Sequence, residues 1–100
     1  MNLSIYIDRQ REWSEQVFGH STRAEGICKH IEKELGEIRA SPHDLMEWVD
    51  VVILALDGAW RAGYTSEEIC AALEQKHAIN FARDWPHNVD ETLPVEHVKA

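Results

Sequence analysis

The sequence has few cysteines and no long apolar run. Its 100 residues include only two cysteines, Cys28 and Cys70, and neither belongs to a CxxC pair. This usage is typical of a reduced, cytoplasmic protein. The longest uninterrupted apolar run, Val51 to Leu56, is far too short to span a bilayer, and the first ten residues lack the apolar stretch of a signal peptide. We therefore expect a cytoplasmic protein with no membrane partner.

Basic residues are also scarce. Ten Lys and Arg stand against 18 Asp and Glu, which gives a formal net charge of −8. No stripe of Lys or Arg exists to replace the counterions of a phosphate backbone, so we expect no nucleic-acid partner. If such an acidic protein binds an anion, a positive group must lie between them, and a divalent metal ion is the obvious candidate.

The period-two alternation of β-strands is missing, whereas helix start and stop signals recur. We expect an all-α, four-helix bundle with a short extended C-terminal tail. Residues 1–86 would form the helical domain, and residues 87–100 would form a C-terminal arm. The predicted helices are Ser4 to Phe18, Arg23 to Arg39, Ser41 to Ala62 and Thr65 to Asp84.

Two helix starts carry capping signals. In "SPHD" we expect Ser41 as N-cap, Pro42 in the first turn and Asp44 closing a capping box. Thr65 and Glu68 have the same capping-box spacing at the start of the fourth helix. Each signal fixes where a helix begins.

Carboxylates border the buried face of the second helix. At about 100° per residue, Glu34 lies only about 20° from Ile27, with Glu37 and His30 just beyond it. The apolar stripe that we expect to face the core comprises Ile27, Ile31, Leu35 and Ile38.

The third helix is apolar on most sides, yet Glu47, Asp50 and Asp57 interrupt it within an arc of about 80°. For this helix alone, a narrow solvated face would explain the acids. However, Glu34 and Glu37 are a second acidic pair, on the preceding helix, and a short turn joins the two helices. Antiparallel packing would bring the two pairs together.

Four converging carboxylates repel one another unless they are protonated or bridged by cations. Oxygen-only ligands suit hard ions such as Mg²⁺ or Mn²⁺. We therefore expect a magnesium or manganese site.

The fourth helix changes character along one face. An apolar stripe of Ile69, Ala72 and Leu73 continues toward the C-terminus as Lys76, Asn80 and Arg83. This pattern favours a surface that binds an anion, although long basic side chains snorkelling at a helix end would look similar.

These residues resemble a known family. "ELGE" at residues 34–37 and "EWVD" at residues 47–50 resemble the ExxE…ExxD motif of the all-α, MazG-like nucleotide pyrophosphohydrolases. The segments "LALDGAWRAG" and KxxxNxxR make the likeness more specific, toward the short phage and bacterial dATP/dGTP diphosphohydrolase branch. It extends from about Gln10 to Pro86.

The resemblance implies Mg²⁺- or Mn²⁺-dependent hydrolysis of a purine nucleoside triphosphate, dGTP or dATP, to the monophosphate and pyrophosphate. It implies a homodimer or homotetramer, working in the host cytoplasm if a phage encodes it. The family's metal-binding and catalytic positions match Glu34, Glu37, Glu47 and Asp50, and its phosphate-contacting positions match Lys76, Asn80 and Arg83. Base and sugar preference, and triphosphate against diphosphate, stay open.

The chain also departs from the family. The usual pattern is EExxE, but Lys33 stands before Glu34, so a carboxylate often assigned as catalytic base is absent. Glu47 and Asp57 are then the candidates for activating water. The sequence has no GxxxxGK[ST] loop and no Ser–His–Asp or Cys–His arrangement, which fits direct attack by water.

Base and phosphate contacts are less constrained. Trp13 or Phe18 would stack on a purine, or would pack in the core. His30 would support the metal site or contact phosphate, or would be an ordinary edge histidine.

Three rival functions remain. A di-iron bundle needs two inward ExxH motifs, but only Glu74 to His77 fits that spacing within the predicted bundle. An HD-type phosphohydrolase would use His43 and Asp44, which capping explains better. A non-enzymatic helical phage regulatory or interaction module would leave the acids merely solvated.

Overall fold

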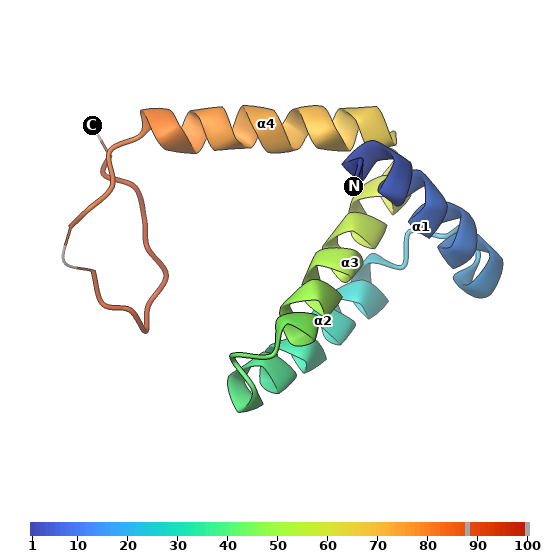
Figure 1. Ribbon diagram of the computed structural model, residues 1–100, viewed down its shortest axis with the longest axis horizontal. Coiled ribbons are helices and arrows are strands. Elements are labelled where there is room, and N and C mark those ends of the chain that lie inside the picture. The colour runs from blue at the N-terminus through green and yellow to red at the C-terminus, as the bar shows by residue number, and fades with distance from the viewer. Residues whose placement is uncertain (88, 100) are drawn as a thin grey trace. The chain divides into compact units, whose positions relative to one another are not determined.

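The protein is all-helical. The computed structural model describes residues 1–87 and 89–99, and no strand occurs among them. The all-α prediction is confirmed, and the predicted helix bounds are right to within about two residues, except at the start of the third helix. The helices are α1 (Leu3–Phe18), α2 (Ala24–Ala40), α3 (Leu45–Arg61) and α4 (Ser66–Ala82) (Figure 1).

The predicted start of the third helix is wrong. The N–H of Ser41 donates to the carbonyls of Glu37 and Ile38, at 3.0 and 3.1 Å, so Ser41 ends α2 instead of capping α3. Asp44 takes the N-cap role, because its carboxylate accepts a hydrogen bond from the Met46 N–H at 3.0 Å. Serine and aspartate are both good N-caps, but the backbone of Ser41 is already bonded to the last turn of α2, so Asp44 caps α3.

Other helix ends follow the sequence signals. Gly19 and Gly63 adopt positive φ angles, of 82° and 109°, just after α1 and α3. At the start of α4, the Glu68 carboxylate accepts from the Thr65 N–H at 3.0 Å, and the Thr65 hydroxyl accepts from the Glu68 N–H at 3.1 Å. The predicted capping box is confirmed.

The chain divides into two units, residues 1–70 and 71–100. In the first, α2 and α3 lie side by side and antiparallel, and α1 also packs against α3 (Figure 1). The Ser4 and Ser66 hydroxyls, 3.0 Å apart, tie α1 to the first residue of α4. The core cluster consists of Ile7, Leu56, Trp60 and Ile69.

The inward stripe of α2 is confirmed in part. Ile27 and Ile38 are buried, and a methyl group of Ile27 lies 3.7 Å from the ideal Cβ position of Gly58, an ordinary van der Waals separation, so Ile27 packs against α3 at this glycine. Ile31 is half-buried, whereas Leu35 is exposed.

The second unit holds the rest of α4 and the tail. Residues 83–87 and 89–99 form no helix or strand, and for residue 87 and residues 89–99 this agrees with the predicted extended tail. The Val98 N–H donates to the Asp84 carbonyl at 2.7 Å, and the His97 and Trp85 rings meet edge to face, with centroids 6.0 Å apart. Within the described residues, no helix has the length and apolar character needed to cross a bilayer.

Candidate functional site

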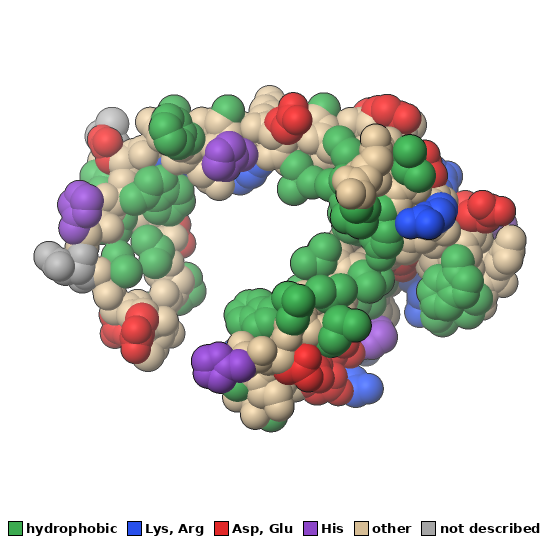
Figure 2. All heavy atoms as spheres, viewed as in Figure 1, with side chains coloured by type: hydrophobic (Ala, Val, Ile, Leu, Met, Phe, Trp, Pro, Cys, Tyr) green, Lys and Arg blue, Asp and Glu red, His purple; other side chains and the backbone are tan. Residues whose placement is uncertain are grey.

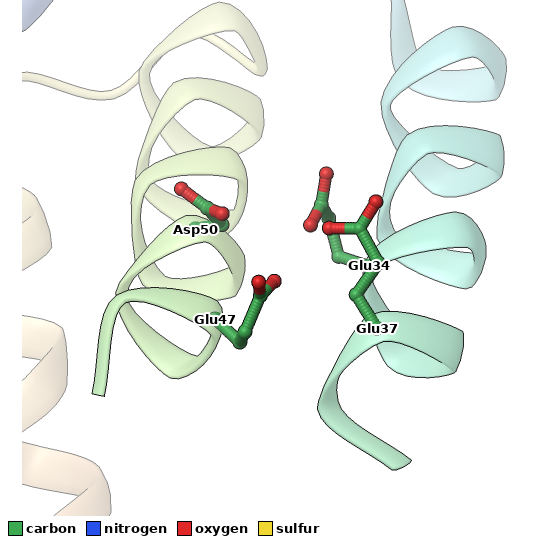
Figure 3. Close-up of side chains that lie close together, drawn as sticks. All are labelled: Glu34, Glu37, Glu47 and Asp50. Carbon is green, nitrogen blue, oxygen red and sulfur yellow. The ribbon is translucent and has the colours of Figure 1, made fainter. Parts of the chain in front are cut away.

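Four carboxylates meet between α2 and α3. Figure 3 shows Glu34 and Glu37 pointing from α2 toward Glu47 and Asp50 on α3. Each residue offers an oxygen, and these oxygens all lie within 4.8 Å of one another. Residues three apart share a helix face, and the short 41–44 turn returns the chain antiparallel, so the end of α2 lies beside the start of α3. The convergence predicted from the two spacings is present.

The crowding of negative charge changes how these acids titrate. The pKa of Glu34 is raised above its ordinary 4.5, first by a hydrogen bond to Glu37 and then by burial and the charges of Glu37 and Asp50. The pKa of Glu47 is raised for the same first reason, a hydrogen bond to Glu37. That of Glu37 is lowered, because it accepts those two hydrogen bonds. Without a cation, Glu34 and Glu47 therefore lose their protons at a higher pH than an ordinary glutamate does.

The donor set fits a hard divalent cation. All the ligand atoms are carboxylate oxygens, which Mg²⁺ and Mn²⁺ prefer. Glu34 Oε2 and Glu47 Oε2 are buried without a hydrogen-bond partner. The four carboxylates lie within 4.8 Å of one another, close enough to hold a divalent cation together. A cation would supply the missing partners.

Two basic side chains border the cluster on α2. His30 Nε2 lies 3.1 Å from Glu34 Oε1, one turn away on the same helix. The charge of Lys33 is among the causes that lower the pKa of Glu37. Lys33 therefore moderates the negative charge at the position where a further carboxylate was expected.

A cavity of about 300 Å³ opens beside the carboxylates in the first unit. Its size is at the lower end of the range for small-molecule sites. Side chains from all three helices line it, including Glu34 and Asp50 from the cluster. The other lining residues are Gln10, Trp13, Ser14, Phe18, Arg23, Gly26, Ile27, His30, Ile53, Leu54 and Asp57.

Asp57 is not a member of the carboxylate cluster. Its Oδ2 accepts a hydrogen bond from Arg61 Nε at 3.1 Å, and both side chains are buried. The remaining Arg61 nitrogens donate to the carbonyls of Gly19 and Ser21, at 2.8 and 2.7 Å, and to the Ser14 hydroxyl at 3.0 Å. An acid engaged in this way is poorly placed to activate water at the cluster, so the geometry favours Glu47 of the two candidates.

The aromatic residues of α1 lie at the cavity. The Trp13 and Phe18 rings meet edge to face, with centroids 5.8 Å apart, and the Arg23 guanidinium lies 4.5 Å from the centre of the Phe18 ring. Both rings are exposed and neither joins the core cluster. They are therefore available to a planar ligand, whereas Trp60 is the tryptophan that packs in the core.

The polar residues predicted on α4 lie in the second unit. Lys76, Asn80 and Arg83 follow one another at helical spacing, and Arg83 Nη1 donates to Asn80 Oδ1 at 3.4 Å. They belong to a different unit from the carboxylates, and their role in phosphate binding stays a prediction.

Sequence reasoning missed Gln10 and Ser14 at the cavity, and Arg61, which pairs with the cavity residue Asp57. Arg61 had a local signal, because Asp57 and Arg61 have the i, i+4 spacing of a helical ion pair. Gln10 and Ser14 had none. They are polar residues at core-facing positions of α1, and their partners on α3 are 43 and 47 residues away along the chain.

The sequence profile of one protein family, dATP/dGTP pyrophosphohydrolase, matches residues 6–100. This match covers both acidic pairs as well as Lys76, Asn80 and Arg83.

Curated relatives come from phages. A dATP/dGTP diphosphohydrolase of Salmonella phage PMBT28 is 41% identical over 81 residues, covering 80% of this chain and 27% of the relative. The Eaa protein of Salmonella phage P22 is 39% identical over 88 residues, covering 88% of this chain and 27% of that protein. A dATP/dGTP diphosphohydrolase of Cyanophage S-2L is 42% identical over 65 residues, covering 63% of this chain and 59% of that protein. The chain thus spans about a quarter of the length of the first two relatives.

A solved structure shares the fold. The Cyanophage S-2L MazG-like pyrophosphohydrolase, bound to dGDP and three catalytic Mn²⁺ ions per active site, superposes with a TM-score of 0.77 at 28% identity. The match covers 99% of each chain. The four helices are therefore those of a MazG-like fold.

Proposed function

Because this chain belongs to the dATP/dGTP pyrophosphohydrolase family, we propose that it hydrolyses purine deoxynucleoside triphosphates, dGTP or dATP, between the α- and β-phosphates. Water would attack the α-phosphorus, the bond from that phosphorus to the bridging oxygen would break, and the monophosphate and pyrophosphate would leave. The observation that carries the proposal is the convergence of four carboxylates beside a cavity. The relatives' names and the ligands of the similar structure agree with it.

The four carboxylates would hold Mg²⁺ or Mn²⁺. When bound, such ions neutralise phosphate oxygens and lower the pKa of an attacking water. Glu34, Glu37, Glu47 and Asp50 would fix the ions between α2 and α3, and Glu47 would also accept the proton of the water. His30 would keep Glu34 oriented through their 3.1 Å contact.

The remaining predicted residues would bind the nucleotide. Lys76 and Arg83 would hold the leaving pyrophosphate, and Asn80 would donate an oriented hydrogen bond. Trp13 would stack on the base at the mouth of the cavity. No covalent intermediate is needed.

We propose that the active form is a homodimer or homotetramer in the cytoplasm, which would be the host's if a phage encodes the chain. Leu45, Trp48 and Val52 are exposed apolar side chains on α3, and Figure 2 shows hydrophobic side chains gathered over this helix. Contiguous exposed apolar surface of this kind is typical of protein contacts. Light scattering on the purified protein would detect the assembly, and a monomer at all concentrations would contradict it.

The test of the activity is product analysis. Purified protein would be incubated with Mn²⁺ and dGTP, dATP, GTP or dGDP, and the products separated by ion exchange. Release of pyrophosphate and monophosphate from a triphosphate is expected. Glu34→Gln and Asp50→Asn should abolish that release without loss of helical content, because each removes one cation ligand.

A matched control is Glu32→Gln, which neutralises an exposed acid on the same helix. This variant should keep wild-type turnover. Wild-type turnover by Glu34→Gln or Asp50→Asn would remove that residue from the mechanism. Absence of Mn²⁺-dependent thermal stabilisation would instead favour a non-enzymatic helical module.

A further inference from the structure

Two buried polar side chains line the cavity in addition to the carboxylate cluster. Gln10 on α1 is 9% exposed and Asp57 on α3 is 6% exposed, and both belong to the cavity wall. Such burial is costly for a polar side chain unless every polar atom finds a partner.

Each of these side chains has one oxygen without a partner. Gln10 Nε2 donates to the Ile53 carbonyl at 2.8 Å, which fixes the orientation of the amide and leaves Oε1 free. Asp57 Oδ2 is taken by Arg61, which leaves Oδ1 free. Both orphaned atoms are acceptors, and an unsatisfied buried acceptor costs about 1–3 kcal/mol. A ligand that offers donors would remove that cost.

The helix register places the two side chains within about one helical turn of each other along the cavity wall. Gln10 contacts Ile53, and Ser14, one turn later on α1, contacts Arg61. Asp57 lies between Ile53 and Arg61, one turn from each. It is also seven residues from Asp50, or about 10 Å along the helix axis. A purine nucleotide spans a comparable distance from its α-phosphate to the Watson–Crick edge of its base.

We propose that Gln10 and Asp57 read the Watson–Crick edge of a guanine base and make the cavity selective for guanine over adenine. This inference rests on the proposed function, because it requires the nucleotide to place its phosphates at the carboxylate cluster. Guanine presents two adjacent donors, N1–H and the 2-amino group, to two acceptors. Adenine presents one donor, its 6-amino group, beside the acceptor N1, so one protein oxygen would face a lone pair.

The apolar walls suit the same ligand. Ile27, Ile53 and Leu54 line the cavity with aliphatic surface, against which a purine ring can pack. The similar structure from Cyanophage S-2L carries dGDP, whose base is guanine.

Binding of uncleavable analogues tests the proposal independently of turnover. Titration calorimetry with Mn²⁺ would compare α,β-methylene dGTP with α,β-methylene dATP. We expect the guanine analogue to bind about tenfold or more tightly. Equal affinities would overturn the inference and would mean that water satisfies the two oxygens.

Asp57→Asn sharpens the test. Its amide oxygen can still accept from Arg61, and its NH₂ group then replaces the free acceptor with a donor. The guanine analogue should lose about tenfold in affinity, while the adenine analogue should bind equally well or better, because the new donor faces adenine N1. An unchanged preference in a folded variant would overturn the inference.

Further variants separate specificity from stability. Gln10→Met removes the second acceptor at similar volume and should also reduce the guanine preference, which covers the case that Asp57→Asn does not fold. Ser14→Ala removes one hydrogen bond to Arg61 but no free acceptor, so it should lower the melting temperature and keep the preference.

The analogue experiment also separates this inference from the proposed reaction. Guanine-selective binding without hydrolysis of any nucleotide would refute the reaction and leave the base-reading role standing. Hydrolysis of dGTP and dATP with equal kcat/KM, together with equal binding of the two analogues, would support the reaction and refute the base-reading role. Failure of both analogues to bind would overturn both.

Discussion

At the scale of single residues, acids of one chemical type have different surroundings in this chain. Glu34 and Glu47 lie among other carboxylates, which raise their pKa values, at a place where a cation fits. Asp57 instead pairs with a buried arginine. The difference follows from the neighbours of each side chain. Glu34 and Glu47 are placed to bind a cation, whereas Asp57 is part of the cavity wall.

We predict that Arg83 contributes to phosphate binding. Arg83→Ala should raise KM for dGTP with little effect on kcat, because the side chain would contact the leaving pyrophosphate in both the ground state and the transition state. KM should rise roughly tenfold, which is the effect expected from losing one charge-assisted contact. Steady-state kinetics with Mn²⁺ measure it.

The control for Arg83 is Arg9→Ala, which removes an exposed arginine of α1. It should leave KM unchanged. If Arg83→Ala also leaves KM unchanged, Arg83 has no role in phosphate binding.

At the scale of elements, Arg61 joins the end of α3 to α1 and to the loop that follows it. Its side chain has no exposed surface, and it donates to Ser14, Gly19 and Ser21 besides Asp57. Arg61→Met should lower the free energy of unfolding by about 3–5 kcal/mol, because it leaves the Asp57 charge buried and unpaired. Urea unfolding followed by circular dichroism measures this loss.

Arg9→Met is the matched substitution at an exposed site, and it should change the free energy of unfolding by no more than about 0.5 kcal/mol. A similarly small effect of Arg61→Met would show that the buried network contributes little to holding α1 against α3.

At the scale of the whole molecule, the carboxylate cluster links stability to pH and to cations. The folded-state pKa values of Glu34 and Glu47 lie above the ordinary 4.5, so above that pH the folded state binds more protons than the unfolded state. Stability must then fall as pH rises through the raised values. The lowered pKa of Glu37 has the opposite sign, but it acts below 4.5.

Glu47→Gln isolates this effect, because the amide imitates the protonated acid at every pH. In EDTA, the variant should become more stable than the wild type as the pH is raised from about 5 to about 7.5. Saturating Mn²⁺ should reverse the order, since the ionised wild-type cluster binds the cation. Thermal melts in both buffers measure it, and a wild type that is the more stable protein in EDTA at the higher pH would contradict the linkage.

Much of the fold and of the candidate site could be predicted from the sequence. The four helices follow from apolar periodicity and caps, which are local properties. Each acidic pair lies on one helix face because its members are three residues apart. The short turn between α2 and α3 favours antiparallel packing, which brings the two pairs together. The Ser41 cap was wrong because two adjacent helix ends competed for the same short segment, and the neighbouring Asp44 served equally well.

The sequence by itself determined which residues form helices and which carboxylates share a helix face, because both depend on contacts within about four residues. Only the tertiary structure decided that Asp57 pairs with Arg61, that Gln10 reaches Ile53, and that a cavity opens beside the acids. Those contacts depend on how α1 packs against α3, and the burial of each polar atom follows from that packing of distant segments.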